Sequence, residues 1–379
     1  MTSVTTAGQP PARVAWLDTV RVLACFLVII CHCTDDYVAG PGVTATDTVA
    51  ALVITGVRAC VPLFVMISGA LLLPMKGGAE AFLKRRFSRI LAPFFIWGVI
   101  LALLPLPGAE SGWAPTNVLK RMTAEGHLPL KVYNIVMLPF NFTDTDIHFW
   151  FLYIIMGLYL LVPVISPWVK QATTRGLAAF LAVWSFTLFL PYIRHWPGHA
   201  IFPEIHGQCD WNTHEMTYYF GGYIGYFVLG HAMMRLPKSS GVKVPLLGAG
   251  MLAAGWATTY FGYLSTVSHR ESQKALEFFI EFLSPNVALM TAGTFLICRS
   301  ITLPAKAEKF LAHLSVLSFG IFLIHYWVLT WLRGRFPVDM LKTLSPGPAM
   351  FLLAILTFLG GWAIAKLVSL LPGKKWLLG

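Results

Sequence analysis

The stretch WLDTVRVLACFLVIICHCTDD, residues 16–36, decides the class of fold. Ten apolar residues separate Arg21 from His32 within it. A helix rises 1.5 Å per residue, so a span of about 20 residues crosses the roughly 30 Å hydrocarbon core of a membrane. Similar runs recur along the 379 residues, of which 56% are hydrophobic and 12% charged, whereas soluble domains carry about 25% charged residues. The sequence therefore predicts an all-α polytopic membrane protein.

The apolar runs predict about ten transmembrane helices and no soluble domain. We expect a disordered cytoplasmic tail over residues 1–13, one transmembrane domain over 14–371 and a short cytoplasmic tail over 372–379. The predicted spans lie near residues 15–34, 48–73, 90–107, 147–165, 177–193, 217–235, 245–264, 276–298, 313–332 and 348–371. With both termini in the cytoplasm, most of the 28 Lys and Arg residues fall on the inside, as the positive-inside rule requires.

Charge and cysteine content narrow the range of partners. The net charge of +11 is spread between apolar spans, which favours contact with membrane lipids and argues against a nucleic-acid partner. Only Cys209 of the six cysteines lies in a polar loop, so we expect no disulfide framework. The His, Cys, Asp and Glu residues lack metal-ligand spacing, and we expect no metal and no permanently bound cofactor.

The first span contains ionisable residues, which are costly in hydrocarbon and therefore mark a candidate site. Arg21 and His32 lie on nearly the same helical face, about 16 Å apart along the axis, and Asp18 shares this face. With the N-terminus inside, Arg21 lies toward the cytoplasm and His32 toward the outer surface. In the alternative interpretation, Arg21 and Asp18 form an interfacial anchor and His32 bonds only a backbone carbonyl.

Four further stretches supply the other candidate residues. They are RACVPLFVMISGALLL (58–73) with Arg58 and Ser68, KRRFSRILAPFF (84–95) with Arg86 and Arg89, HFWFLYIIMGLYLLVP (148–163) with His148, and LSFGIFLIHYWVL (317–329) with His325. The predicted topology places His32, His148 and His325 at a similar depth. In this order, and with the spacing of Arg21 and His32, residues 14–371 resemble the acyltransferase-3 family. These bacterial membrane acyltransferases include O-acetyltransferases of surface polysaccharides, among them a branch acting on enterobacterial common antigen.

The resemblance implies a membrane O-acyltransferase, most often an O-acetyltransferase, in the bacterial cytoplasmic (inner) membrane. It implies acyl-coenzyme A as the donor and a carbohydrate or lipid-linked glycan as the acceptor. The predicted catalytic residues are His32, as general base, and Arg21, supported by Asp35 or Asp36, His148 and His325. The predicted donor-binding residues are Arg58, Ser68, Arg86 and Arg89. The guanidinium groups of Arg86 and Arg89 suit the donor's phosphates, Ser68 could contact its pantetheine arm, and Arg58 is expected to face the cavity with an acid or the donor.

Each of these assignments has a plainer alternative. The positive-inside rule alone explains Arg86 and Arg89, and Ser68 beside Gly69 is typical of close helix packing. Arg58 could extend its side chain to the outer membrane surface, and His148 could be an interfacial residue beside an aromatic belt. His325 could simply make a hydrogen bond that packs two helices together. Phe319 and Phe322 stand where many relatives have Tyr, which argues against a hydroxyl role there.

A transporter or flippase for a polysaccharide or its lipid-linked precursor is the rival function, because intramembrane Arg and His also mark transport pathways. The sequence has no inverted repeat that would favour it, and a scaffold would not require three histidines at one depth. Two outside segments, 108–146 and 194–216, are the expected place of acceptor specificity. Their aromatic residues suit either sugar rings or the membrane interface, and the candidates are Trp113, Trp196, His206 and Trp211.

Overall fold

The computed structural model describes residues 13–37, 48–104, 129–143, 146–194, 220–237, 241–269, 277–335 and 346–379. All regular structure in these residues is helical, and they contain no strand. The helices are α1 (Ala15–Cys33), η1 (Asp35–Tyr37), α2 (Thr48–Gly56), α3 (Cys60–Leu72), α4 (Ala79–Leu103), α6 (Leu130–Met137), η2 (Ile147–Phe149), α7 (Trp150–Gln171), α8 (Thr174–Arg194), α9 (Ile224–Arg235), α10 (Lys243–His269), α12 (Pro285–Ser300), α13 (Ala305–Arg335), α15 (Pro346–Val368) and α16 (Lys374–Leu378).

Seven helical segments of the described chain are long and apolar enough to cross a membrane. They are Ala15–Cys33, Thr48–Leu72, Ala79–Leu103, Ile147–Gln171, Thr174–Ile193, Ala305–Arg335 and Pro346–Val368. This confirms the predicted class, an all-α polytopic membrane protein. The count of ten spans stays a prediction, as does the orientation. The three other predicted spans overlap α9, α10 and α12.

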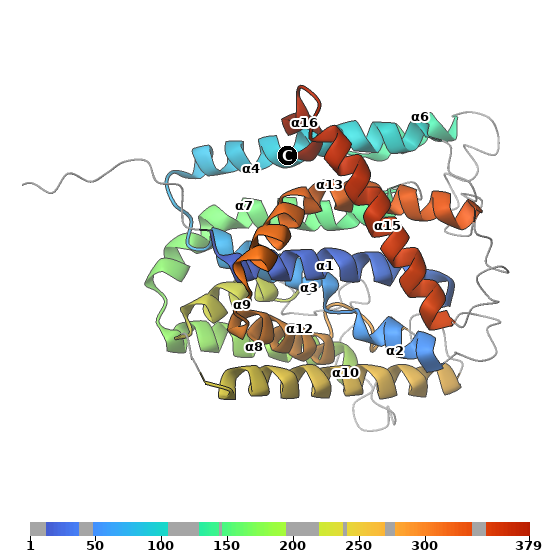
Figure 1. Ribbon diagram of the computed structural model, residues 1–379. Coiled ribbons are helices and arrows are strands. Elements are labelled where there is room, and N and C mark those ends of the chain that lie inside the picture. The colour runs from blue at the N-terminus through green and yellow to red at the C-terminus, as the bar shows by residue number, and fades with distance from the viewer. Residues whose placement is uncertain are drawn as a thin grey trace, which may run out of the picture.

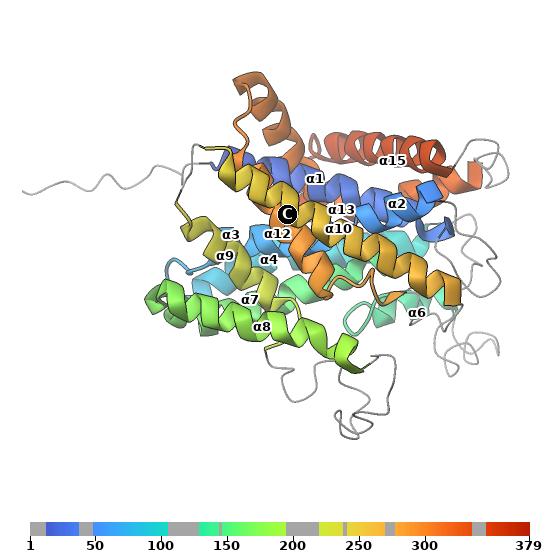
Figure 2. The same cartoon turned by 90° about the horizontal axis from the view of Figure 1, so that it is seen from below.

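Helix α1 lies in the middle of the bundle (Figure 1) and packs against α3, α12, α13 and α15. Its buried side includes Val20, Ala24 and Val28, which recur every fourth residue as expected for one helical face. Helix α10 runs along α12 and α2 (Figure 2). The central position of α1 brings its two ends, with Arg21 and His32, into contact with several other helices.

Glycines allow two other helix pairs to approach closely. A Cβ atom on Gly69 of α3 would lie 1.8 Å from the carbonyl oxygen of Phe227 on α9, and one on Gly230 would lie 2.0 Å from that of Met66. Helices α10 and α12 meet in the same way at Gly248. Small residues at such crossings are typical of membrane helices, because close contact replaces the missing hydrophobic driving force.

The predicted span 48–73 is divided in the structure. Helix α2 ends at Gly56 and α3 begins at Cys60, with Arg58 in the turn between them. Pro62 in the first turn of α3 explains the break, since proline has no N–H to bond the carbonyl of residue 58. Non-helical backbone at membrane depth is tolerated only where it is buried in protein or lines a cavity. The break at Arg58 is therefore expected to be buried in protein or to line a cavity.

Candidate active site

The last turn of α1 carries an imidazole–carboxylate pair. The Nδ1 atom of His32 lies 3.2 Å from a carboxylate oxygen of Asp35, three residues later. After α1 the chain continues into the short helix η1, where the Tyr37 N–H donates to the Thr34 carbonyl. This helical turn places the Asp35 side chain beside the His32 ring. Because an ionised carboxylate only accepts, Nδ1 carries the proton and Nε2 of the neutral ring has a free lone pair. Asp36 also belongs to η1, but its side chain is outside the described part of the structure.

His32 lines a cavity of about 160 Å³, which we call the His32 cavity. Its wall combines a few polar groups with many apolar and aromatic side chains, as ligand sites usually do. The polar lining residues are Cys31, His32, Asp35, Arg58, Cys60 and His148, and the aromatic ones are Phe64, Trp150, Phe151, Phe282 and Phe322. A larger hollow of about 690 Å³ between α7, α8 and α9 has an apolar lining without ionisable groups, so it offers no candidate acid or base.

Three histidines from different parts of the chain meet here: His32 and His148 line the cavity, and His325 lies against both. The ring centroid of His325, on α13, lies 5.4 Å from that of His32 and 4.9 Å from that of His148, in η2. The ring of Tyr326 lies 5.3 Å from His32 and 5.6 Å from His148. The structure therefore brings together the three histidines that the sequence pointed to, while their roles stay predictions.

The hydrogen bonds of His148 and His325 fix which nitrogen carries the proton. His148 Nε2 donates to the Leu323 carbonyl at 3.1 Å, and His325 Nδ1 donates to the Phe322 carbonyl at 2.6 Å. A carbonyl can only accept, so in the neutral rings the other nitrogens are acceptors. Both of these nitrogens are buried and have no hydrogen-bond partner among the described residues. Since a buried acceptor without a donor is costly, the site has unused capacity to accept hydrogen bonds.

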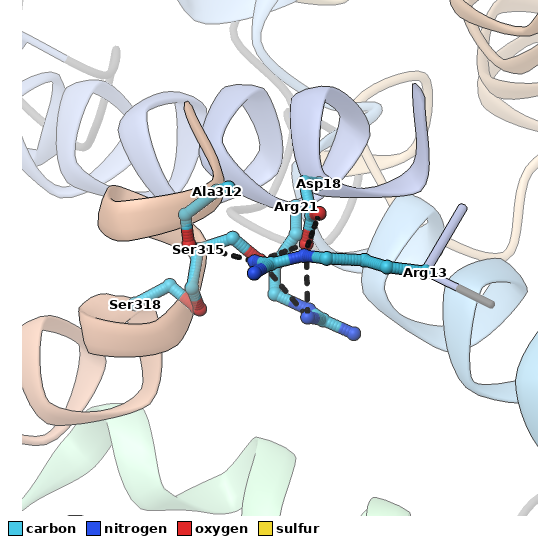
Figure 3. Close-up of polar contacts among 6 residues, drawn as sticks. All are labelled: Arg13, Asp18, Arg21, Ala312, Ser315 and Ser318. Atoms are coloured by element: carbon cyan, nitrogen blue, oxygen red, sulfur yellow. Dashed lines mark hydrogen bonds and ion pairs between the residues drawn. The ribbon is translucent and has the colours of Figure 1, made fainter. Parts of the chain in front are cut away.

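The opposite end of α1 holds a different network, which Figure 3 shows. Asp18, only 5% exposed, accepts hydrogen bonds from Arg13 at 2.5 Å and from the Ser315 hydroxyl at 2.6 Å. Arg21 donates to the Ser315 hydroxyl at 2.9 Å and lies 3.7 Å from the Asp18 carboxylate. Arg13 also donates to the Ala312 carbonyl of α13. Arg21 therefore pairs with Asp18 and ties α1 to α13, away from the His32 cavity.

Arg86 and Arg89 of α4 share one neighbour with Arg21 of α1. All three guanidinium groups are within electrostatic range of Tyr159 on α7, and we call this group the Tyr159 basic cluster. Arg86 also lies over the ring of Phe82, at 5.7 Å, and its buried Nε has no hydrogen-bond partner among the described residues. The cluster brings several cations together without an equal number of acids, which suits an anionic ligand.

The predicted donor-binding residues do not form one group. Arg58 lines the His32 cavity and does not belong to the Tyr159 basic cluster. Ser68 lies outside the cavity lining and donates its hydroxyl hydrogen bond to the Phe64 carbonyl within α3, at 2.9 Å. The aromatic candidates of the outside segments, Trp113, Trp196, His206 and Trp211, lie outside the described residues.

Sequence reasoning missed several neighbours of His32. Arg333, at the far end of α13, donates to the His32 carbonyl at 2.7 Å. Cys31 and Cys60 line the cavity as free thiols, and Tyr326 borders two of the histidines. Tyr326 is adjacent to His325 and Cys31 to His32 in the sequence, but Cys60 and Arg333 reach the site only through the packing of α1, α3 and α13.

Comparison with known proteins supplies the family. A protein-family model described as an acyltransferase domain matches residues 14–366, which is most of the chain. No curated protein and no solved structure matches the sequence significantly. The match identifies the family without selecting a branch, so the branch acting on enterobacterial common antigen stays a prediction. The chain belongs to the acyltransferase-3 family of membrane acyltransferases.

Proposed function

We propose that this acyltransferase moves an acyl group, acetyl in the first instance, from cytoplasmic acyl-coenzyme A to a carbohydrate hydroxyl. The acceptor is a cell-surface or exported glycan, or its lipid-linked form, at the outer face of the bacterial cytoplasmic membrane. The observation that carries the proposal is the His32–Asp35 pair, at 3.2 Å, in a cavity that also contains His148 and Arg58. A hydroxyl needs a base to become a nucleophile, and this pair is an oriented base.

The proposed reaction uses His32 as general base and then as general acid. Its free Nε2 takes the proton of the acceptor hydroxyl while the hydroxyl oxygen attacks the thioester carbonyl carbon. The tetrahedral intermediate collapses, the carbon–sulfur bond breaks, and the coenzyme A thiolate takes the proton from the imidazolium. Asp35 holds Nδ1–H and stabilises the imidazolium in between, as a carboxylate does in related His-dependent acyl transfer.

The Tyr159 basic cluster is the proposed binding place of the donor's phosphates. Arg21, Arg86 and Arg89 gather positive charge there, and guanidinium groups bind phosphate by paired hydrogen bonds. Arg21 and His32 are about 16 Å apart along α1, so the long arm of coenzyme A would extend beside this helix to the His32 cavity. Arg21 is then a donor-positioning residue.

A carbohydrate acceptor suits the lining of the His32 cavity. The rings of Trp150 and Phe282 stack at 5.7 Å, and such aromatic faces pack well against sugar rings. The unpartnered Nδ1 of His148 needs a hydrogen-bond donor, which a sugar hydroxyl provides. The acceptor thus supplies both the reacting hydroxyl and a partner for a buried nitrogen.

The experiment that tests the proposal measures transfer from radiolabelled acetyl-coenzyme A to glycan mixtures by purified protein in liposomes. We expect His32→Ala to lower turnover by about 10²–10⁴-fold, the usual contribution of a general base, while donor binding persists. His313→Ala is the matched control, because His313 is exposed on α13 and lies outside the cavity. Intact protein that neither binds nor turns over any acyl donor, yet moves glycan across the membrane, would favour the transporter instead.

A further inference from the structure

Arg58 is held at the His32 cavity from two sides. Its Nε donates to the Ile54 carbonyl at the end of α2, at 3.1 Å, and its guanidinium carbon lies over the ring of Phe282, at 5.9 Å. The side chain lines the same 160 Å³ cavity as His32. Arg58 therefore does not snorkel to a membrane surface, and the break between α2 and α3 presents its charge to the proposed reaction site.

The guanidinium group of Arg58 has no ion-pair partner among the described residues. Asp35, the carboxylate that lines the cavity, pairs with His32 instead. The thiols of Cys31 and Cys60, and the carboxylates of Asp35 and Glu281, act on Arg58 only at longer electrostatic range. Its terminal nitrogens make no hydrogen bond to described residues, and only Nε is bonded. Because an unpaired cation in a membrane protein is costly, its retention here indicates a ligand with negative charge.

The start of α3 adds to the positive potential at the same place. Cys60 and Val61, the first residues of α3, line the cavity beside Arg58. The N-terminal end of a helix carries a partial positive charge from its aligned peptide dipoles. Here the Cys60 N–H bonds the Val57 carbonyl and Pro62 has no N–H, so only this dipole contributes. Arg58 is also the only Lys or Arg among the described residues that line the cavity. The guanidinium and the helix end thus favour an anion on one side of the space that His32 faces.

We propose that Arg58 is a catalytic residue that stabilises the oxyanion of the acyl-transfer intermediate, an inference that rests on the proposed function. When the acceptor oxygen bonds to the thioester carbonyl carbon, its proton passes to His32 and the carbonyl electron pair moves onto oxygen. Arg58 donates hydrogen bonds to that oxygen. The pair then returns, the carbon–sulfur bond breaks, and the thiolate takes the proton from His32. This assigns Arg58 to the acyl end of the donor and not to its phosphates.

The test compares Arg58→Gln and Arg58→Lys with wild type in liposomes, at saturating acceptor. Loss of one oxyanion donor typically lowers kcat by about 10²–10³-fold, and we expect this for Arg58→Gln. Arg58→Lys keeps the charge but loses the planar guanidinium group, so its kcat should lie between those of wild type and Arg58→Gln. The Kd of an unreactive thioether analogue of acetyl-coenzyme A should stay within about twofold, because ground-state binding is not the lost interaction.

Two further measurements separate catalysis from a structural role. Added guanidinium ion should partly restore kcat to Arg58→Ala, which a merely misfolded protein would not show. Arg175→Gln, at an exposed position on α8, removes the same charge away from the cavity and should leave kcat unchanged. Thermal melting in detergent reports whether each variant is folded.

Several outcomes would overturn the assignment. A folded Arg58→Gln with wild-type kcat contradicts it outright, and unchanged kcat with a large rise in donor Kd would make Arg58 a phosphate ligand. If Arg58→Gln does not fold, wild-type kcat in Arg58→Lys, together with no guanidinium rescue, would also contradict it. If the wild type transfers no acyl group to any acceptor, the proposed function itself fails, and the inference about Arg58 falls with it.

Discussion

At the scale of single residues, Asp35 tests how His32 is oriented. Asp35→Asn keeps the size of the side chain but removes the charge that stabilises the protonated ring at 3.2 Å. We expect kcat to fall by about 10- to 100-fold, as when other histidine-orienting partners are removed, with donor Kd unchanged. Steady-state transfer assays and analogue binding, on the same preparations, provide both values.

The matched control for Asp35 is Glu308→Gln, which removes a carboxylate near the start of α13, outside the cavity lining. It should leave transfer unchanged. Equal kcat values for Asp35→Asn and wild type would show that the 3.2 Å contact has no part in turnover. A fall in both variants would instead point to a general effect of charge on the protein.

The residues differ in how far the sequence alone could place them. Asp35 lies three positions after His32, so local helical geometry is sufficient to predict their contact. The alternating direction of the spans predicted only that His148 and His325 lie at a similar depth, and their contact required the packing of the helices. The position of Arg58 required the tertiary fold, because whether a membrane arginine snorkels or turns inward depends on its neighbours, here Phe282 and the Ile54 carbonyl.

At the scale of helices, the crossing of α3 and α9 depends on two glycines. A methyl group on Gly230 would lie 2.0 Å from the Met66 carbonyl oxygen, so backbone must move to accept it. Gly230→Ala should therefore destabilise the protein by about 1–3 kcal/mol, the usual cost of overpacking. Melting temperatures in detergent, compared with wild type, measure the effect.

Gly157→Ala is the control for this crossing, because Gly157 of α7 has open space around its missing Cβ. Alanine favours the helix by up to about 1 kcal/mol over glycine, so this variant should melt no lower than wild type. Unchanged melting of Gly230→Ala would show that α3 and α9 are not packed as closely as the structure describes. Since α3 contributes Cys60, Val61 and Phe64 to the His32 cavity, activity should fall together with stability in Gly230→Ala.

The sequence predicted the existence of the helices better than their ends. A long apolar run identifies a span because only length and hydropathy decide whether it crosses the bilayer. Prolines inside two predicted spans mark helix starts that hydropathy alone did not locate. Pro62 follows the break before α3, and α12 begins at Pro285 and not near residue 276. Both prolines occupy the first turn of a helix, where a missing N–H costs least. These prolines were therefore the feature of the sequence that could have predicted the helix starts.

At the scale of the whole molecule, α1 and α13 connect two chemically different regions. The Asp18 network joins them near the Tyr159 basic cluster, and Arg333 joins them again at the His32 carbonyl. A cationic cluster and a base-containing cavity at opposite ends of one helix suit a substrate that is long and anionic at one end. This arrangement is meaningful for transfer across a membrane only if the two regions face opposite sides.

That orientation can be tested with Cys209, the one cysteine outside the apolar runs. With the N-terminus in the cytoplasm, the segment 194–216 lies outside, so a membrane-impermeant maleimide should label Cys209 in right-side-out vesicles. Cys209→Ser controls for reaction at the cavity thiols Cys31 and Cys60. Labelling of Cys209 only in inverted vesicles would reverse the topology. It would then place the His32 end of α1 at the cytoplasmic face, where acyl-coenzyme A would reach His32 directly and the acceptor would have to be cytoplasmic.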